Sequence, residues 1–242
     1  MEKTSYDIEK EVEGFHWWFS VRRKLLRSIL LSLPIGHGST VLDIGCGTGS
    51  NLKLLRAERL NVIGLDSSFY ALSLAKRNSE YALINGDLNR LPIRSESIGL
   101  IIAMDTLEHL EDDRRGVREC FQALKGGGIL VLTVPAFRWL WGIQDLMTQH
   151  RRRYLKKEVL NLLSLEGFEV LKSSYFNFFL FFPILLARRT TWLLGLKIRS
   201  ENEINSPVVN FFLKEIFSLE PSILEHFSFP FGVSIMCIAR KK

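Results

Sequence analysis

Three glycines lie close together near residue 45. Gly45, Gly47 and Gly49 alternate within VLDIGCGTGS, residues 41–50, where an apolar run ends at Asp43. Glycine is needed where φ is positive, or where a ligand must touch the backbone without meeting a Cβ. Amide groups of such a turn, and the positive end of a helix that follows it, favour an anionic group. The G-x-G-x-G spacing is tighter than the G-x-G-x-x-G of a dinucleotide site, so it predicts a ligand smaller than NAD.

Two further acids follow at positions that suit a nucleoside. Asp66 ends the apolar run NVIGLD, 23 residues after Asp43 (66 − 43), and Asp87 ends the short segment Asn85-Gly86-Asp87. A carboxylate such as that of Asp66 can accept hydrogen bonds from both hydroxyls of a ribose. Asp87 is placed to accept from an exocyclic amine, such as that of adenine. Each acid alone could be a helix N-cap or a turn former, but three acids and three glycines at successive strand ends are harder to explain in that way.

These residues follow short apolar segments that are typical of β-strands. Such segments cover residues 40–44, 61–66, 81–85, 98–104 and 128–134, and helical patterns cover 50–60, 68–79 and 112–128 between them. Five β units with helical crossovers predict a parallel sheet covered on both faces, which is a doubly wound α/β fold. In such sheets a ligand binds beyond the carboxyl ends of the strands, where the strand order reverses.

The composition limits the class of protein. The chain has 242 residues, of which 47% are hydrophobic and 24% charged, so disordered and fibrous classes are excluded. Its three cysteines, Cys46, Cys120 and Cys237, form no C-x-x-C spacing, so neither a disulfide framework nor a zinc site is indicated, and no metal is predicted.

The first 14 residues are polar and acidic, unlike a signal peptide, so a reducing, cytoplasmic location is expected. The net charge of +6 is spread over short clusters, which indicates a basic surface rather than a nucleic-acid partner.

Taken together, the motifs resemble those of class I S-adenosylmethionine-dependent methyltransferases, in particular the small-molecule branch called type 11. The matching segments are D-I-G-C-G-T-G at 43–49, G-L-D-S-S at 64–68, G-D-L-N-R-L-P at 86–92, D-T-L-E-H at 105–109 and L-K-G-G-G-I-L-V-L-T-V-P at 124–135. They follow the family's order and cover residues 38–135. One departure is Ser97-Ile98-Gly99, where the family usually has Ser-Phe-Asp before the fourth strand. The missing acid belongs to the strand start, away from the cofactor.

The resemblance implies a seven-stranded, mostly parallel sheet with an antiparallel last strand, and S-adenosyl-L-methionine as the cofactor, released as S-adenosyl-L-homocysteine. The methionine part would lie over the 45–49 turn, Asp66 would hold the ribose, and Asp87 with the Leu88 backbone would bind the adenine. Asp43 would anchor the turn and approach the methionine amino group, and Arg22 would pair with the methionine carboxylate. The implied cofactor contacts are Asp43, Gly45, Cys46, Gly47, Gly49, Asp66, Ser67, Asp87, Leu88, Met104 and Arg22.

The implied chemistry is an in-line displacement of a methyl group from a sulfonium, to which positioning of the acceptor contributes much. A hydroxyl acceptor would also need a general base, for which His109 and His150 are the candidates. An equal alternative for His109 is a structural residue hydrogen-bonded under the site. Val134-Pro135-Ala136-Phe137 replaces the Pro-Pro motif of base N-methyltransferases, and no cysteine lies in a cytosine-C5 motif. Nucleic-acid methylation is therefore disfavoured.

Two flanking segments, F-H-W-W-F-S-V-R-R at 15–23 and D-L-M-T-Q-H-R-R-R-Y at 145–154, resemble paired signatures of a subgroup associated with cell-surface glycan and polyprenyl-linked pathways. From them His16, Trp17, Arg152 and Tyr154 are predicted on the acceptor side. Tryptophans beside a histidine could be core packing. Ahead of an amphipathic helix over 21–33, they suit an N-terminal lid that closes over the cofactor, and lid and helix together make up residues 1–37.

The methyltransferase core is expected to comprise 38–175 and 230–242, with 176–229 as an inserted apolar helical cap. The apolar run 178–187 is shorter than the roughly 20 residues of a membrane span, and Pro183 splits it. A buried cap helix is one reading. The other is an interfacial segment, with peripheral membrane contact through 176–197, because aromatic residues precede Arg188, Arg189 and Trp192.

Two functions remain open from the sequence. The first is a methyltransferase acting on a small or lipid-linked acceptor, such as a sugar, a polyprenyl compound or a quinone-like ring. The second is a cofactor-binding regulatory or partner protein of the same fold without turnover. The complete set of cofactor-contact positions favours the enzyme. The acceptor atom and the oligomeric state are left open.

Overall fold

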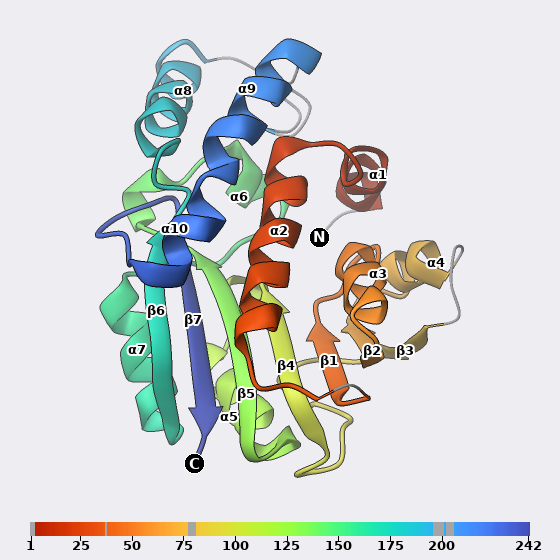
Figure 1. Ribbon diagram of the computed structural model, residues 1–242. Coiled ribbons are helices and arrows are strands. Elements are labelled where there is room, and N and C mark those ends of the chain that lie inside the picture. The colour runs from red at the N-terminus through yellow and green to blue at the C-terminus, as the bar shows by residue number, and fades with distance from the viewer. Residues whose placement is uncertain (1–2, 37, 77–80, 196–200, 202–205) are drawn as a thin grey trace.

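The computed structural model describes residues 3–36, 38–76, 81–195, 201 and 206–242. The strands are β1 (Thr40–Ile44), β2 (Asn61–Asp66), β3 (Ala82–Asn85), β4 (Ile98–Met104), β5 (Leu124–Pro135), β6 (Phe168–Phe176) and β7 (Ser234–Lys241). They form one sheet in the order β3-β2-β1-β4-β5-β7-β6 (Figure 1). β7 pairs antiparallel with both β5 and β6, whereas the other pairs are parallel. The predicted doubly wound, seven-stranded sheet with an antiparallel last strand is confirmed.

The strand order places the carboxyl ends of β1, β2 and β4 side by side. Ile44 at the end of β1 pairs with Leu65 of β2 and with Ala103 of β4. All three residues are almost completely buried, because helices cover both faces of a sheet of this kind. The strand order reverses between β1 and β4, so this is the edge at which a ligand of such a fold binds.

The helices that cover the sheet are α2 (Trp17–Ser32), α3 (Ser50–Ala57), α4 (Phe69–Lys76), α5 (Asp113–Ala123) and α7 (Lys156–Leu165). In α2, Val21, Leu25 and Ile29 are spaced four apart and all are buried in the main core. His16 caps this helix, since its Nδ1 accepts the backbone N–H of Trp18 at 3.3 Å. The predicted amphipathic helix over 21–33 is therefore present, and it begins earlier, at Trp17.

The predicted helix over 112–128 is too long. Helix α5 ends at Ala123, and residues 124–128 belong to β5. Glycine is a poor helix former, and the run from Gly126 to Gly128 includes Gly127 with φ +76°. The chain therefore leaves the helix before these glycines. Of the helix predicted over 68–79, α4 covers Phe69–Lys76, and residues 77–79 lie outside the described residues.

Helices α8 (Phe181–Leu193), α9 (Pro207–Ser218) and α10 (Glu220–His226) lie between β6 and β7 in the chain, and α8 and α9 project beyond the carboxyl edge of the sheet (Figure 1). Pro183 does not split the apolar segment, because it lies in the first turn of α8, where proline is tolerated. Within the described residues, no helix is long and apolar enough to cross a membrane. Residues 196–200 and 202–205 of the expected cap lie outside the described part of the chain.

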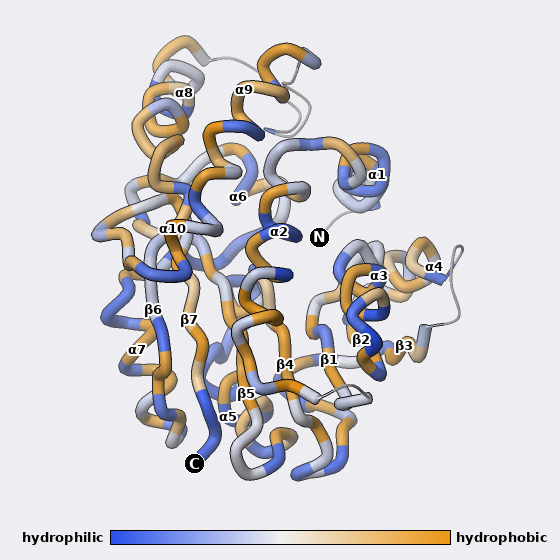
Figure 2. The backbone as a smooth tube through the Cα atoms, viewed as in Figure 1, coloured by the Kyte–Doolittle hydropathy of each residue, from blue (hydrophilic) through white to orange (hydrophobic). Residues whose placement is uncertain are grey.

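The prediction of a buried cap helix is wrong for α8. Phe181 is its one buried residue, whereas Phe182 is 64% exposed and Trp192 is 76% exposed. Figure 2 shows that α8 and α9 are hydrophobic along much of their length at this end of the molecule. The helix projects past the sheet, so among the described residues too few lie around it to bury all its sides.

Candidate functional site

A cavity of about 1220 Å³ lies at the carboxyl edge of the sheet. The predicted site residues that line it are Arg22, Gly45, Cys46, Gly47, Asp66, Ser67, Asp87, Leu88, Met104, His16, Trp17, His109 and His150. Four predicted residues do not line it, namely Asp43, Gly49, Arg152 and Tyr154. The structure thus brings most of the predicted cofactor contacts and both predicted catalytic histidines to one cavity.

The three glycines of the turn after β1 are needed for two different reasons. Gly45 has φ +70°, and a Cβ there would lie 2.5 Å from the Thr106 hydroxyl. Gly49 has φ +85°, and a Cβ there would lie 3.0 Å from the Ala75 Cβ. Gly47 has φ +53°, but a Cβ there would meet no atom of the described residues within 4 Å. Packing therefore requires the outer two glycines, whereas the middle one borders open space on the cavity wall, where a ligand can approach the backbone.

Asp66 connects this turn to β2. Its Oδ2 accepts the backbone N–H of Gly47 at 2.9 Å, and its Oδ1 accepts that of Ser68 at 2.8 Å. Burial raises the pKa of Asp66, while the two backbone hydrogen bonds oppose that rise. The carboxylate also lines the cavity. An ionised carboxylate accepts about four hydrogen bonds, so Asp66 can hold the turn and still accept from the hydroxyls of a ribose.

Asp43 lies beneath the turn rather than in the cavity. It is 1% exposed, and its Oδ2 has no hydrogen-bond partner among the described residues. Burial, with the neighbouring charge of Asp66, raises the pKa of Asp43 to about 8. In the structure it is Asp66, and not Asp43, that hydrogen-bonds to the turn. Both acids end apolar runs, so the sequence did not distinguish these roles.

The N-terminal segment, with α1 (Lys3–Val12), packs across the glycine turn. The Thr48 hydroxyl donates to Glu13, and the Lys10 ammonium donates to the Thr48 carbonyl at 3.4 Å. Nearer the N-terminus, the Ser5 hydroxyl donates to the Met147 carbonyl at 3.3 Å. These contacts place α1 where the predicted lid would lie.

Arg22 has a protein partner that the sequence did not indicate. Its Nη2 lies 2.8 Å from Asp105 Oδ2, and Asp105 Oδ1 accepts the Thr133 hydroxyl at 3.1 Å. The guanidinium also stacks over Trp18, 5.1 Å from the ring centroid. Asp105 has φ +54° at the end of β4, a backbone conformation that is rare outside glycine. Arg22 therefore lines the cavity as a fixed cation, and its predicted pairing with a ligand carboxylate would be shared with Asp105.

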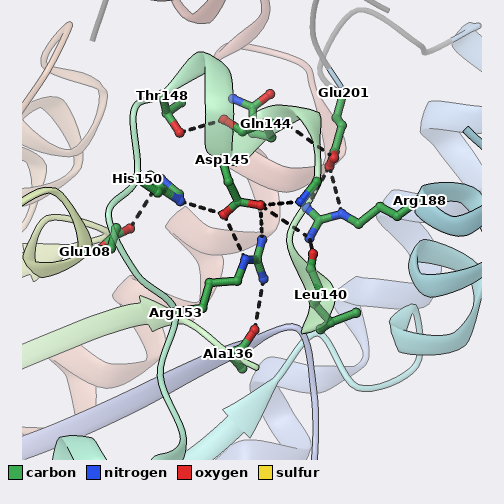
Figure 3. Close-up of polar contacts among 11 residues, drawn as sticks. Glu108, Ala136, Leu140, Gln144, Asp145, Thr148, His150, Arg153, Arg188 and Glu201 are labelled. Atoms are coloured by element: carbon green, nitrogen blue, oxygen red, sulfur yellow. Dashed lines mark hydrogen bonds and ion pairs between the residues drawn. The ribbon is translucent and has the colours of Figure 1, made fainter. Parts of the chain in front are cut away.

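A buried polar network lies behind His150 (Figure 3). Asp145, on α6 (Ile143–Met147), receives Arg153 Nε at 2.8 Å and Arg153 Nη2 at 2.9 Å, and it bonds to His150 Nδ1 at 2.8 Å. Burial alone would raise the pKa of Asp145, but the bond to His150 and the charge of Arg153 outweigh it, so the pKa is lowered. The ionised Asp145 carboxylate fixes the orientation of the His150 ring. In this orientation, His150 Nε2 lies 3.7 Å from Glu108 Oε1.

The two predicted catalytic histidines are in contact. The ring centroids of His109 and His150 lie 4.8 Å apart in an edge-on arrangement. Burial, followed by the neighbouring His150, lowers the pKa of His109 to about 4, so this imidazole is neutral at pH 7. Asp145 and Arg153 were missed as functional residues. The D-x-x-x-x-H-x-x-R spacing from 145 to 153 could have indicated both residues. The prediction took Arg152 and Tyr154 from the same segment instead.

Arg152 and Tyr154 point away from the cavity, which corrects their predicted place on the acceptor side. Arg152 Nη2 donates to the carbonyls of Leu110 and Glu111, at 2.9 and 2.7 Å. The buried Tyr154 hydroxyl donates to Asp113 Oδ2 at 2.9 Å. Both side chains therefore connect this segment to the start of α5.

The backbone at Phe15 and Trp17 joins the N-terminal segment to the cap, and His16 lies between them. The Trp17 backbone N–H donates to Asn210 Oδ1 on α9 at 2.7 Å, and Asn210 Nδ2 donates to the Phe15 carbonyl at 3.1 Å. Burial lowers the pKa of His16 to about 4, so its neutral ring can serve as the N-cap acceptor. The Trp17 side chain remains in the cavity wall.

The opposite end of the cavity is largely apolar. Large apolar residues line it from η2 (Arg138–Leu140), from the residue after η2, and from α6, α8 and α9: Trp139, Leu140, Trp141, Ile143, Ile184, Leu185, Trp192, Val209 and Leu213. Trp192 is among the most exposed of these. The cavity therefore extends from the polar glycine turn to the exposed apolar surface of the cap.

Comparison with known proteins gives a consistent picture. Residues 42–132 match a family described as a methyltransferase domain. The demethylmenaquinone methyltransferase of Thermotoga maritima is 31% identical over 195 residues, which are 68% of this chain and 83% of that protein. A probable S-adenosylmethionine-dependent methyltransferase of Mycolicibacterium smegmatis is 31% identical over 138 residues, which are 55% of this chain and 53% of that protein. The chain spans about half the length of this protein and of the mycobacterial relatives that follow it.

Solved structures with the same fold include the [4+2]-cyclase SpnF. It superposes with a TM-score of 0.66 at 20% identity, over 98% of this chain and 94% of the cyclase. Identity at this level shows the fold alone. Because a cyclase is among the structural neighbours, the activity has to be argued from the site.

Proposed function

Because the chain belongs to the type 11 class I S-adenosylmethionine-dependent methyltransferases, we propose that it transfers a methyl group to a small amphiphilic acceptor. When bound, the cofactor supplies an electrophilic methyl group on a sulfonium. The observation that carries the proposal is the cavity itself, which joins a glycine turn and three strand ends to an apolar, partly exposed cap.

The polar end of the cavity would bind the cofactor. Asp66 accepts hydrogen bonds from the ribose, Gly47 leaves its backbone open to the methionine part, and Asp87 with Leu88 borders the adenine. Arg22, held by Asp105, places a positive charge beside the methionine carboxylate. The α1 segment covers the turn, so it would exclude water from the methyl group.

The two histidines are the proposed groups on the acceptor side. His109 and His150 line the same cavity as the turn, and Asp145 fixes the orientation of His150. A hydroxyl acceptor must also lose its proton, and the lowered pKa of His109 makes that imidazole a weak base, so the better candidate is His150, which Asp145 orients. For a carbon or nitrogen acceptor, the same walls need only hold the acceptor in line with the sulfonium.

The apolar end of the cavity would hold a hydrocarbon tail. Arg189 and Trp192 line this end of the cavity, and α8 and α9 carry exposed apolar side chains, including Phe182 and Phe212. Aromatic and aliphatic side chains beside arginines suit shallow contact with an anionic membrane, where each basic residue contributes about 1 kcal/mol. The proposed acceptor is therefore a prenylated quinone-like ring or another lipid-linked molecule. The name of the Thermotoga relative supports the quinone-like choice.

The test uses acceptors that share one ring and differ in tail. Methyl-labelled S-adenosylmethionine is incubated with a demethylated quinol carrying no tail, a short prenyl tail or a long one. We expect kcat/KM to rise with tail length, because the tail fills the apolar end of the cavity. Equal kcat/KM values for the tailless and long-tailed quinols would contradict an amphiphilic acceptor.

Membrane contact is tested separately by flotation with phosphatidylglycerol vesicles at low salt. Trp192→Glu should reduce the fraction of protein that floats, because it places a charge in the exposed apolar surface of the cap. Leu31→Glu is the matched control, since Leu31 is 68% exposed on α2, outside the cap. Equal loss in both variants, or no flotation of the unmodified protein, would contradict contact through the cap.

A further inference from the structure

Two histidines and a glutamate meet in the wall of the cavity. Atoms of Glu108, His109 and His150 that could ligate a metal all lie within 4.8 Å of one another. Glu108 and His109 are neighbours in η1 (Leu107–His109), just after β4, whereas His150 follows α6. We infer that these three side chains bind one divalent first-row transition-metal ion, such as zinc. Two imidazoles and one carboxylate form a ligand set that such ions favour.

Glu108 provides the first independent argument. Its side chain is fully buried, and neither carboxylate oxygen has a hydrogen-bond partner among the described residues. The neighbouring carboxylates have cations of their own, since Asp105 pairs with Arg22 and Asp145 with Arg153, both at 2.8 Å. A buried carboxylate without such a partner is strongly disfavoured. A metal ion between Glu108 and the histidines would compensate the negative charge of this carboxylate.

The two imidazoles provide the second argument. Asp145 holds His150 through Nδ1 and turns Nε2 toward Glu108 Oε1, at 3.7 Å (Figure 3). The His109 ring hydrogen-bonds to the backbone of Gln149, a residue with φ +58°. Metal-bound histidines are characteristically held in this way, by a carboxylate or a backbone carbonyl on the nitrogen that does not bind the metal. Each imidazole therefore has a second nitrogen available to the ion.

The geometry is close to that of a zinc site. Ligand atoms at about 2.0–2.1 Å from a tetrahedral zinc ion lie about 3.3 Å from one another. Side-chain rotations that bring the widest pair together by about 1.5 Å would close the site. Three protein ligands leave a fourth position, as in catalytic zinc sites. That position faces the cavity, because His109 and His150 both line it.

The ion would act on the acceptor, and this part of the inference rests on the proposed function. An acceptor hydroxyl bound at the fourth position would be more acidic, so its proton could pass to water without a protein base. The cysteine spacing had indicated no zinc site. A histidine and carboxylate set split between residues 108–109 and 150 has no local pattern that a sequence would reveal.

The experiment is a titration that requires no methyl transfer. Protein treated with a chelator and then dialysed is titrated calorimetrically with zinc chloride in the absence of S-adenosylmethionine. We expect one zinc ion per chain, and Glu108→Gln and His150→Ala should each weaken binding at least about tenfold. The matched controls Glu111→Gln and His226→Ala change exposed side chains of the same types and should bind zinc like the unmodified protein.

Glu108→Gln keeps the shape of the side chain, so thermal unfolding should show a folded variant. Cobalt(II) provides a second readout, because its visible absorption reports ligation by nitrogen and oxygen, and Glu108→Gln should change that spectrum. No zinc binding by the unmodified protein, or unchanged binding by folded Glu108→Gln, would overturn the site. Specific zinc binding in a protein that methylates no acceptor would uphold the site and contradict the proposed function alone.

Discussion

Replacement of Asp66 by asparagine separates the two roles given to this carboxylate. The side chain keeps its size but loses its charge, and one of its oxygens becomes an NH₂ donor. Its two oxygens accept the backbone N–H groups of Gly47 and Ser68, at 2.9 and 2.8 Å. In the variant, one of these backbone N–H groups would face the NH₂ donor of the asparagine. The ribose hydroxyls would lose a charged acceptor.

The expected magnitude follows from these contacts. Hydrogen bonds to charged groups contribute about 1.5–3 kcal/mol, so the affinity for S-adenosylmethionine should fall about 10- to 150-fold. The buried backbone N–H that loses its acceptor should lower the free energy of unfolding by about 1–3 kcal/mol. Both losses should therefore be measurable in a protein that still folds.

The assay is calorimetric titration with S-adenosylmethionine, combined with urea unfolding. Glu119→Gln is the matched control, because Glu119 also accepts a backbone N–H, that of Leu91 at 3.0 Å, but does not line the cavity. It should lose stability and keep the affinity for the cofactor. Unchanged affinity in folded Asp66→Asn, or an equal loss of affinity in both variants, would refute the assignment of Asp66 to the ribose.

Three further changes test other parts of the structure. Gly47→Val should abolish measurable S-adenosylmethionine binding, because its side chain would enter open space on the cavity wall, whereas Gly38→Val, at φ +78° with equally open surroundings, should bind normally in the same titration. Burial raises the pKa of Glu220 from 4.5 to about 7, so its contribution to stability is complete below pH 4.5 and is lost as the pH rises through about 7. Glu220→Gln should therefore gain stability over the unmodified protein as the pH rises, by up to about 3 kcal/mol at pH 8 in urea unfolding, and a pH-independent difference would contradict the raised pKa. Arg153→Met should lower the free energy of unfolding by up to about 3–5 kcal/mol, because the buried Asp145 carboxylate loses its two-pronged partner and keeps only His150, the Gly142 backbone N–H and Arg188 at 4.0 Å. The exposed Arg138→Met should change it by less than about 1 kcal/mol, and similar losses in the two would contradict the buried ion pair.

The parts of the fold that could be predicted depend on short-range patterns. The apolar runs before Asp43 and Asp66 and the glycines between them define a strand, a turn and a helix start within a few residues. Each of these patterns spans only a few neighbouring residues, so the strands around the turn lie where the sequence predicts them. The helix predicted to 128 was too long because apolar spacing alone did not account for the glycines that follow Ala123.

The acceptor side could be predicted only in part, because its contacts join distant segments. His109 and His150 were predicted from residue type, and the structure brings them together. The spacing from Asp145 to Arg153 is visible in the sequence, but its meaning, like that of the buried Glu108, depends on tertiary neighbours. The exposure of α8 likewise depends on how far the helix projects past the sheet, which no periodicity of its own residues encodes.

The most direct test of the central claim is the fate of the methyl label. The protein is incubated with methyl-tritiated S-adenosylmethionine and a total membrane lipid extract, and the label is counted in the organic and aqueous phases. Transfer to an amphiphilic acceptor predicts label in the organic phase with the unmodified protein and none with Gly47→Val. Tight cofactor binding with no label in the organic phase, and with all the aqueous label still on S-adenosylmethionine, would contradict methyl transfer and indicate a cofactor-binding partner protein.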